Sequence, residues 1–153
     1  MKLIVLDDKG VINEVNDPFI QTPEQWIPIP GSLEAIAKLT HQGYRVIVAT
    51  NQSGIGRGLL DMDTFNAIND KLFKAAQAAG GYLDALFFCP HAQQEHCHCR
   101  KPEIGLFKEI IQRYSTDLKD VPVVGDSLKD LQAASSIGAT PILVLTGNGQ
   151  QTQ

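Results

Sequence analysis

Apolar residues in this chain form either short continuous runs or stripes with a helical repeat, and the two patterns alternate. Continuous runs predict strands buried on both faces, and they cover residues 2–6, 44–49, 83–88, 121–124 and 141–145. Helical stripes fall between them, at residues 32–43, 65–79, 104–114 and 128–137. This alternation predicts an α/β fold with a doubly wound parallel sheet and right-handed crossovers.

Two stretches have no clear periodicity. Residues 14–30 contain four prolines, and we interpret them as a long irregular loop. Phe19 and Trp26 could pack over a site, but we favour the interpretation that they anchor this loop to the body of the protein. The polar residues 147–153 are interpreted as a loose tail. A length of 153 residues suits one domain, 1–153, and leaves no room for a cap domain that would cover a site.

Composition and charge narrow the classes of partner. The net charge is −4 and the basic residues are scattered, so the sequence predicts no basic surface for nucleic acid or for an anionic membrane. No apolar run approaches the ~20 residues that span a bilayer, and the N-terminus lacks the pattern of a signal peptide. We expect a cytoplasmic monomer that acts on a small soluble molecule.

Polar side chains follow three of the predicted strands at the point where each strand ends. Asp7 follows the first, Thr50 and Asn51 follow the second, and Asp126 follows the run at 121–124. The carboxyl ends of parallel strands meet at one edge of a sheet, where such folds bind their ligands. Two carboxylates and a hydroxyl at this edge would suit Mg²⁺ and a phosphate, and Lys101 supplies a cation.

Plainer interpretations of the same acidic residues remain open at this point. Asp7 and Asp8 could simply begin a turn before Gly10. Asp130 completes a helix-capping pattern with Ser127, which explains Asp130 without a metal. We therefore interpret Asp126 as the metal ligand and Asp130 as a cap or a supporting residue.

The three cysteines of the chain lie within eleven residues of one another, together with several histidines. Cys89, Cys97 and Cys99 with His91 would form a closed tetrahedral set for a structural Zn²⁺, in place of a disulfide framework. His96 and His98 are competing candidates for the fourth ligand, but the spacing favours His91. The predicted zinc loop leads directly to Arg100 and Lys101, so its role would be to position these two cations.

Five short motifs run through nearly the whole chain. They are Leu6-Asp7-x-x-Gly10-Val-Ile-Asn13, Ala49-Thr-Asn-Gln-Ser-Gly54 with Gly56-Arg-Gly58, Cys99-Arg-Lys-Pro102, Gly125-Asp-Ser127 and Leu145-Thr-Gly-Asn-Gly149. In this order they resemble the haloacid dehalogenase-like (HAD-like) phosphohydrolases, which have a Rossmann-like fold. Within that superfamily the resemblance is strongest to the heptose bisphosphate phosphatases, and it also supports His91 as a zinc ligand.

The resemblance implies a phosphoaspartyl mechanism. Asp7 would be the nucleophile, Thr50 and Lys101 would hold phosphoryl oxygens, and Mg²⁺ would bind Asp7, Asp126 and the backbone carbonyl of Lys9. The implied reaction removes the 7-phosphate of D-glycero-D-manno-heptose 1,7-bisphosphate, a step toward the heptose of bacterial surface glycolipid. Candidate substrate contacts are Asn16 and Asp17 of the 14–30 loop, Asn51, Gln52 and Ser53 after the second strand, and Arg100, whose fork suits a second phosphate.

One catalytic position departs from the family pattern. These enzymes carry a proton-transferring aspartate two residues after the nucleophile, where this chain has Lys9. An ammonium group is a poor general base at neutral pH, and Asp8 should point to the opposite side of the strand. We expect strongly impaired turnover, unless Mg²⁺ and Arg100 deprotonate Lys9 or a loop shift brings Asp8 inward.

Two other functions remain as alternatives. Histidinol-phosphate phosphatases resemble this chain and share the short zinc loop, although residues 53–58 and 146–149 favour the heptose branch. Because of Lys9, the chain could instead be a pseudo-phosphatase that binds a sugar phosphate without turning it over.

Overall fold

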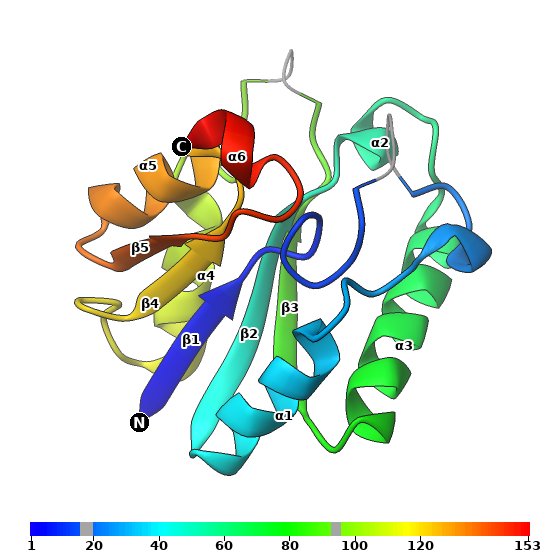
Figure 1. The fold of residues 1–153 in the computed structure, drawn as a ribbon. Helices are drawn as coiled ribbons and strands as arrows, with labels where there is room; N and C mark the ends of the chain where they lie inside the picture. The colour runs from blue at the N-terminus through cyan, green and yellow to red at the C-terminus, as the bar shows by residue number, and fades with distance from the viewer. Residues whose placement is uncertain (16–19, 93–95) are drawn as a thin grey trace.

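The computed structural model describes residues 1–15, 20–92 and 96–153. Five parallel strands form one sheet in the order β3-β2-β1-β4-β5 (Figure 1). The strands are β1 (Lys2–Leu6), β2 (Tyr44–Asn51), β3 (Leu83–Cys89), β4 (Pro122–Gly125) and β5 (Thr140–Leu143). The chain leaves β1 toward β2 on one side and returns to β4 on the other, so the carboxyl ends of β1 and β4 form the switch point where such sheets bind ligands.

Helices cover both faces of the sheet, which confirms the predicted α/β fold. On one face, α1 (Ser32–His41) and α3 (Met62–Ala78) pack in a cluster that includes Ile4 and Leu6 of β1. On the other face, α4 (Gly105–Tyr114) and α5 (Leu128–Ser136) pack in a cluster that includes Leu3 and Val5. Successive side chains of a strand point to opposite faces, so a strand covered on both sides is apolar at every position.

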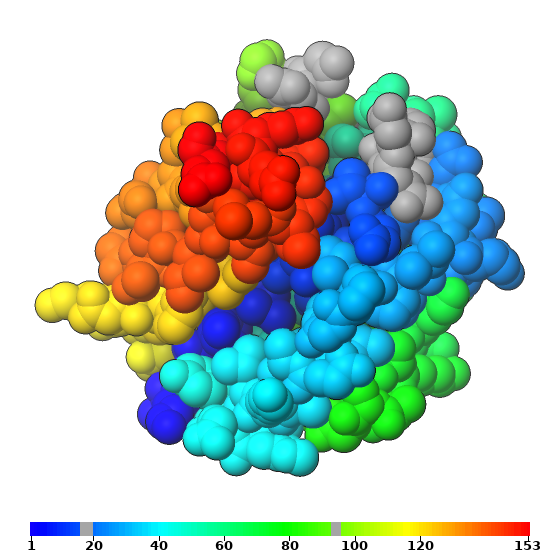
Figure 2. Space-filling model, in the orientation of Figure 1, coloured from blue at the N-terminus to red at the C-terminus, as the bar shows by residue number. Residues whose placement is uncertain are grey.

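The face that carries α1 is open on the side of β5. Val124 and Ile142 are paired neighbours on β4 and β5, and Ile142 remains 41% exposed. An apolar groove of about 200 Å³ runs between α1 and the strands β1 and β4, with Val144, just after β5, at its side. In Figure 2, dark-blue atoms of the N-terminal strand are visible between α1 and the C-terminal segment. Strand β5 is therefore packed mainly by α5, on the other face.

The 14–30 loop is irregular over its described residues apart from the short 3-10 helix η1 (Pro23–Gln25). Trp26 is buried and anchors this loop, as the sequence predicts. Lys71 of α3 supports it, because its ammonium group donates to the carbonyl oxygens of Pro23 (2.7 Å) and Trp26 (3.1 Å). Residues 16–19 lie outside the described part of the chain.

Two short helices lie where the sequence predicts loops. In the glycine-rich segment after β2, residues Ser53–Gly56 form α2. The tail is not loose, and this expectation was wrong, because Gly149–Thr152 form α6. The backbone N–H of Asn148 donates to Asp126 Oδ2 (2.9 Å), and the hydroxyl of Thr152 donates to the carbonyl oxygen of Asp126 (2.9 Å). These bonds hold the tail against the sheet edge.

Among the helices of the described residues, none has the length and apolar character that crossing a membrane requires.

Candidate functional site

The site begins at the end of β1, where Asp7 still follows the line of the strand. Its backbone N–H donates to the carbonyl oxygen of Val124 on β4 (3.0 Å), which fixes Asp7 at the switch point. Gly10 then turns the chain with a φ of +81°, and a Cβ atom at this position would overlap the carboxylate of Asp126. Position 10 therefore requires glycine for two reasons: the positive φ of its backbone and the close approach of the Asp126 carboxylate.

The side chain of Lys101 links three elements at the base of the site: the end of β1, strand β2 and the start of α5. Its side chain is buried, and its ammonium group lies 2.8 Å from Asp130 Oδ1, 2.8 Å from the carbonyl oxygen of Ala49 and 3.6 Å from Asp7 Oδ1. Burial alone would lower the pKa of Lys101, but the nearby carboxylates raise the pKa above its usual value. Lys101 therefore stays a cation at the place where a phosphoryl group would meet Asp7.

Three carboxylates lie together beside this ammonium group, which contacts two of them, Asp7 and Asp130. The possible ligand atoms of Asp7, Asp126 and Asp130 all lie within 4.8 Å of one another. Burial raises the pKa of Asp7 well above its usual value, with Lys101 opposing the shift, and burial also raises the pKa of Asp126. Buried carboxylates that repel one another favour a bound cation, and oxygen ligands suit Mg²⁺.

The hydrogen bonds distinguish the acidic residues from one another. Asp130 Oδ1 accepts from Lys101, and its Oδ2 accepts from the hydroxyl of Ser127 (2.9 Å), so both oxygens are engaged. Burial raises the pKa of Asp130, but the charge of Lys101 and the hydrogen bonds from Lys101 and Ser127 together lower this pKa below its usual value. Asp126 Oδ2 accepts from the N–H of Asn148, and no side chain of the described residues donates to its Oδ1. The donor set therefore fits a cation held by Asp7 and Asp126, with Asp130 as a helix cap.

A cavity of about 230 Å³ opens above these groups. Its walls combine cations and carboxylates with a few neutral side chains, from Asp7, Lys9, Val15, Asn51, Arg100, Lys101, Asp126, Ser127, Lys129, Asp130 and Asn148. Asn51 braces the wall with both ends of its amide: Oδ1 accepts from the N–H of Lys101 (2.9 Å) and Nδ2 donates to its carbonyl oxygen (3.2 Å). This cavity can hold an anionic group next to Asp7.

The two residues after Asp7 point in different directions. Lys9 lines the cavity, and its ammonium group donates to the carbonyl oxygen of Asn51 (2.8 Å). Asp8 is buried on the other side, facing a separate cavity of about 10 Å³. Its Oδ1 accepts from the hydroxyl of Thr50 (2.7 Å), and its Oδ2 accepts from the amide of Gln52 (3.3 Å). The side chain that position 9 presents to the cavity is therefore a lysine, where the resemblance to the family implies a proton-transferring carboxylate.

Several residues expected from the sequence do not line the cavity. The hydroxyl of Thr50 is turned toward Asp8, Gln52 borders the small cavity beside Asp8, and Ser53 begins α2. Asn16 and Asp17 lie outside the described residues.

Sequence reasoning gave no site role to four residues that line the cavity, Val15, Ser127, Lys129 and Asn148. Asn148 belongs to a motif that the sequence displays, but the polar composition around it suggested a tail. Lys129 has no sequence signal of its own beyond its place between Ser127 and Asp130.

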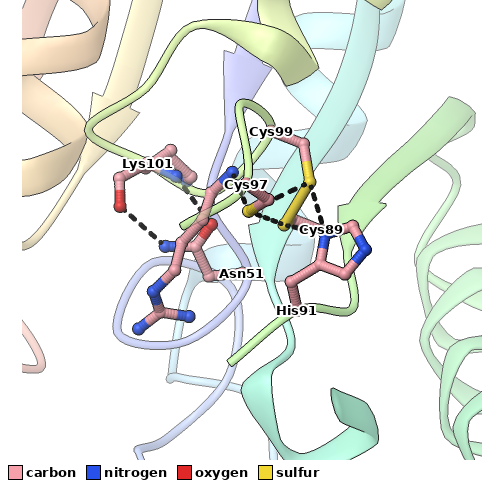
Figure 3. Close-up of a disulfide and its surroundings, with 7 residues drawn as sticks. Asn51, Cys89, His91, Cys97, Cys99 and Lys101 are labelled. Atoms are coloured by element: carbon pink, nitrogen blue, oxygen red, sulfur yellow. Dashed lines mark hydrogen bonds between the residues drawn. A yellow bond between two sulfur atoms is a disulfide. The ribbon is translucent and has the colours of Figure 1, made fainter. Parts of the chain in front are cut away.

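The cysteine cluster lies at the end of β3, beside the cavity (Figure 3). Cys97 Sγ is 3.4 Å from Cys89 Sγ and 3.6 Å from Cys99 Sγ, and His91 Nδ1 is 3.3 Å from Cys99 Sγ. The four possible ligand atoms lie within 4.8 Å of one another, and the group contains neither His96 nor His98. The structure joins Cys89 and Cys99 by a disulfide and leaves Cys97 free, because the fold brings these sulfurs into bonding contact.

Comparison with known proteins places this geometry in a family. Residues 98–153 match the HAD-hydrolase-like family. The chain is 53% identical over 152 residues to the D-glycero-β-D-manno-heptose-1,7-bisphosphate 7-phosphatase of Bordetella bronchiseptica, covering 99% of this chain and 85% of that protein. The chain belongs to the heptose-1,7-bisphosphate 7-phosphatase family. The member from Neisseria meningitidis serogroup A is 45% identical over 152 residues, which are 99% of this chain and 81% of that protein.

Solved structures of this phosphatase family share the fold. The crystal structure of the B. bronchiseptica D,D-heptose 1,7-bisphosphate phosphatase, complexed with magnesium and phosphate, superposes with a TM-score of 0.97 over 99% of this chain and 85% of that chain, at 53% identity. The Burkholderia thailandensis phosphatase gives a TM-score of 0.76 at 51% identity, over 99% and 83% of the two chains. The fold of this phosphatase family therefore extends over nearly the whole of this chain.

Proposed function

We propose that the chain is a Mg²⁺-dependent phosphatase for the 7-phosphate of D-glycero-β-D-manno-heptose 1,7-bisphosphate. The observation that carries the proposal is the group of Asp7, Asp126 and Lys101 at the switch point of the sheet, beside an open cavity. The names of the similar proteins supply the substrate and the position of the phosphate. They favour the heptose substrate over histidinol phosphate.

The geometry supports a reaction in two steps. A carboxylate oxygen of Asp7 attacks the phosphorus, the bond from phosphorus to the oxygen on C7 breaks, and that oxygen takes a proton from solvent water as the sugar leaves. Water then attacks the phosphorus and loses a proton to solvent, and the bond from phosphorus to the Asp7 oxygen breaks, which releases inorganic phosphate and restores Asp7. Mg²⁺ held by Asp7, Asp126 and the carbonyl of Lys9 would supply charge neutralisation for the phosphoryl oxygens. Lys101 stabilises the same oxygens from below, and Asn51 holds the backbone of Lys101 in place.

Lys9 makes this reaction slow in the proposed mechanism. Its ammonium group carries a proton but has no free electron pair with which to take one from the attacking water. Asp8 cannot take over that task, because its carboxylate faces Thr50 and Gln52 outside the cavity. A protein that binds the sugar phosphate with little turnover is the second candidate, and the position of Lys9 is the observation that favours it.

The cysteine cluster fits a structural Zn²⁺ in the reduced protein. Three sulfurs and one imidazole nitrogen lie within 4.8 Å of one another, and these four donors are the types that make a closed tetrahedral zinc site. A disulfide between Cys89 and Cys99 uses two of the same sulfurs, so zinc with all four ligands requires reduction of that bond. The cluster precedes Arg100 and Lys101 directly, and the N–H of Arg100 donates to Cys97 Sγ (3.4 Å). We infer that zinc positions these two cations, and that Arg100 holds the second phosphate of the substrate.

Release of inorganic phosphate tests the function. The chain is incubated with Mg²⁺ and heptose 1,7-bisphosphate, with histidinol phosphate in a parallel reaction, and Asp7→Asn serves as the inactive control. We expect slow release from the bisphosphate that Asp7→Asn abolishes and that exceeds release from histidinol phosphate. Preference for histidinol phosphate would overturn the substrate assignment. Binding of the bisphosphate with no release above the Asp7→Asn control would instead establish the binding protein.

A further inference from the structure

The groups that would hold Mg²⁺ come from two separate segments of the chain. Asp7 and the carbonyl oxygen of Lys9 belong to the loop that follows β1, whereas Asp126 follows β4. A metal ion binds well only when its ligands are held at the right spacing, and Mg²⁺ is especially demanding in its geometry. Residues that tie the first loop to Asp126 can therefore set the affinity of the site without touching the metal.

The C-terminal segment, residues 146–152, contacts the first loop. The hydroxyl of Thr146 donates to the carbonyl oxygen of Gly10 (2.7 Å), so the segment, red in Figure 1, lies beside the blue loop after β1. Gly147 follows with a φ of +57°, and a Cβ atom there would overlap both Gly10 Cα and Asp126 Oδ2. The segment therefore packs tightly against the loop and the carboxylate at the same time.

The same segment holds Asp126 at two points. The backbone N–H of Asn148 donates to Asp126 Oδ2 (2.9 Å). The hydroxyl of Thr152 shares its proton between the carbonyl oxygens of Asp126 (2.9 Å) and Asn148 (3.0 Å). Neither Thr146 nor Thr152 lines the cavity beside Asp126, so neither hydroxyl would touch a phosphate bound there.

We propose that residues 146–152 form a clamp that sets the Mg²⁺ affinity of the site, with Thr146 and Thr152 as its positioning residues. The inference rests on the proposed function, because the clamped groups are those of the proposed magnesium site. Partners that orient metal ligands typically contribute 10–100-fold to metal affinity. Loss of either hydroxyl frees the first loop or Asp126 to move, and the ligands then match Mg²⁺ less well.

Magnesium binding tests the clamp without any substrate. Mg²⁺ is titrated by calorimetry into the unmodified chain, Thr146→Val and Thr152→Val. Valine keeps the branched shape and removes the hydroxyl, so we expect each variant to bind Mg²⁺ about tenfold more weakly. Thr146→Ser and Thr152→Ser keep the hydroxyl and should restore the affinity. Thr140→Val is the matched control, because Thr140 is exposed at the start of β5 and its side chain makes no hydrogen bond with the described residues.

Gly147→Ala disturbs the same clamp without removing a hydroxyl, and it should also weaken Mg²⁺ binding. Thermal melting without Mg²⁺ checks that the variants compared are folded. Weaker binding that serine restores, with Thr140→Val unchanged, supports the clamp. Unchanged affinity in the folded variants, a loss that serine does not restore, or a loss that Thr140→Val shares overturns the clamp and leaves the proposed function standing. If the unmodified chain binds no Mg²⁺, the metal site of the proposed function fails and the clamp fails with it.

Discussion

Replacing Lys9 by aspartate places a carboxylate where the family has its proton-transferring group. Lys9 lines the cavity beside Asp7, so a carboxylate on the same backbone lies close to the reacting phosphoryl group. A positioned proton-transfer group contributes roughly 10²–10⁴ to the rate. At 1.36 kcal/mol for each factor of ten, this is about 2.7–5.4 kcal/mol of activation free energy. We expect Lys9→Asp to raise kcat by at least about 100-fold.

Two smaller effects of the same substitution act in the other direction. The hydrogen bond from Lys9 Nζ to the carbonyl oxygen of Asn51 (2.8 Å) is lost, which lowers the free energy of unfolding by roughly 0.5–1.5 kcal/mol. The positive charge of Lys9 also helps to lower the pKa of Asp7, so its removal makes the nucleophile harder to ionise. Mg²⁺ bound to Asp7 opposes this second effect. Neither loss approaches the expected gain in rate.

The assay is steady-state phosphate release from heptose 1,7-bisphosphate at pH 7 with saturating Mg²⁺. Lys9→Asn is the matched control, because it removes the ammonium group and supplies no base. If Lys9→Asn were as fast as Lys9→Asp, the gain would come from removing a cation and not from proton transfer. Equal rates for the unmodified chain and Lys9→Asp, with both proteins folded, would refute the reasoning.

Three further predictions concern the zinc cluster, the buried ion pair of Lys101 with Asp130, and the hydrogen bond of Tyr114 with Asp84. Protein purified under reducing conditions should contain about one zinc per chain by elemental analysis, and Cys97→Ser should lower this content; absence of zinc would overturn the site. Asp130→Ala leaves the buried ammonium group of Lys101 without its closest carboxylate, so the free energy of unfolding in urea should fall by about 3–5 kcal/mol, and an unchanged value would contradict the pairing. Burial and a hydrogen bond to Asp84 raise the pKa of Tyr114 from 10.0 to about 12. The folded state thus holds this proton more tightly, so stability should decline as the pH rises from 10 to 12, and Tyr114→Phe should remove that part of the decline.

The sequence predicts the sheet well because its strands are buried on both faces. The run from Leu3 to Leu6 is apolar at every position, and the structure packs its alternate residues against helices on opposite sides. Asp7 and Asp126 could also be placed in advance, since the carboxyl ends of parallel strands meet at one edge. These predictions depend on local pattern and on general rules of topology, and both are visible in a single sequence.

Contacts between distant parts of the chain could not be predicted in this way. Thr146 donates through its hydroxyl to the carbonyl oxygen of Gly10 (2.7 Å), which joins the C-terminal segment to the first loop. Together with the bonds from Asn148 and Thr152 to Asp126, this contact orders a segment whose polar composition suggested a tail. A helix of four residues is too short to show an amphipathic pattern in the sequence. The structure of this segment therefore becomes apparent only from its hydrogen bonds to Gly10 and Asp126.

The neighbours of Asp8 decide which route to activity is open to this chain. Moving the Asp8 carboxylate into the cavity would break its hydrogen bonds with the backbone N–H of Lys9 (2.7 Å), the hydroxyl of Thr50 (2.7 Å) and the amide of Gln52 (3.3 Å). Each such bond stabilises the protein by roughly 0.5–1.5 kcal/mol, and the fully buried hydroxyl of Thr50 would lose its best acceptor. The loop shift therefore costs several kcal/mol, which is comparable to the barrier reduction that a proton-transfer group provides. Asp8 stabilises the strand end in a position from which it cannot serve as the base, and a carboxylate at position 9 is the direct route to faster turnover.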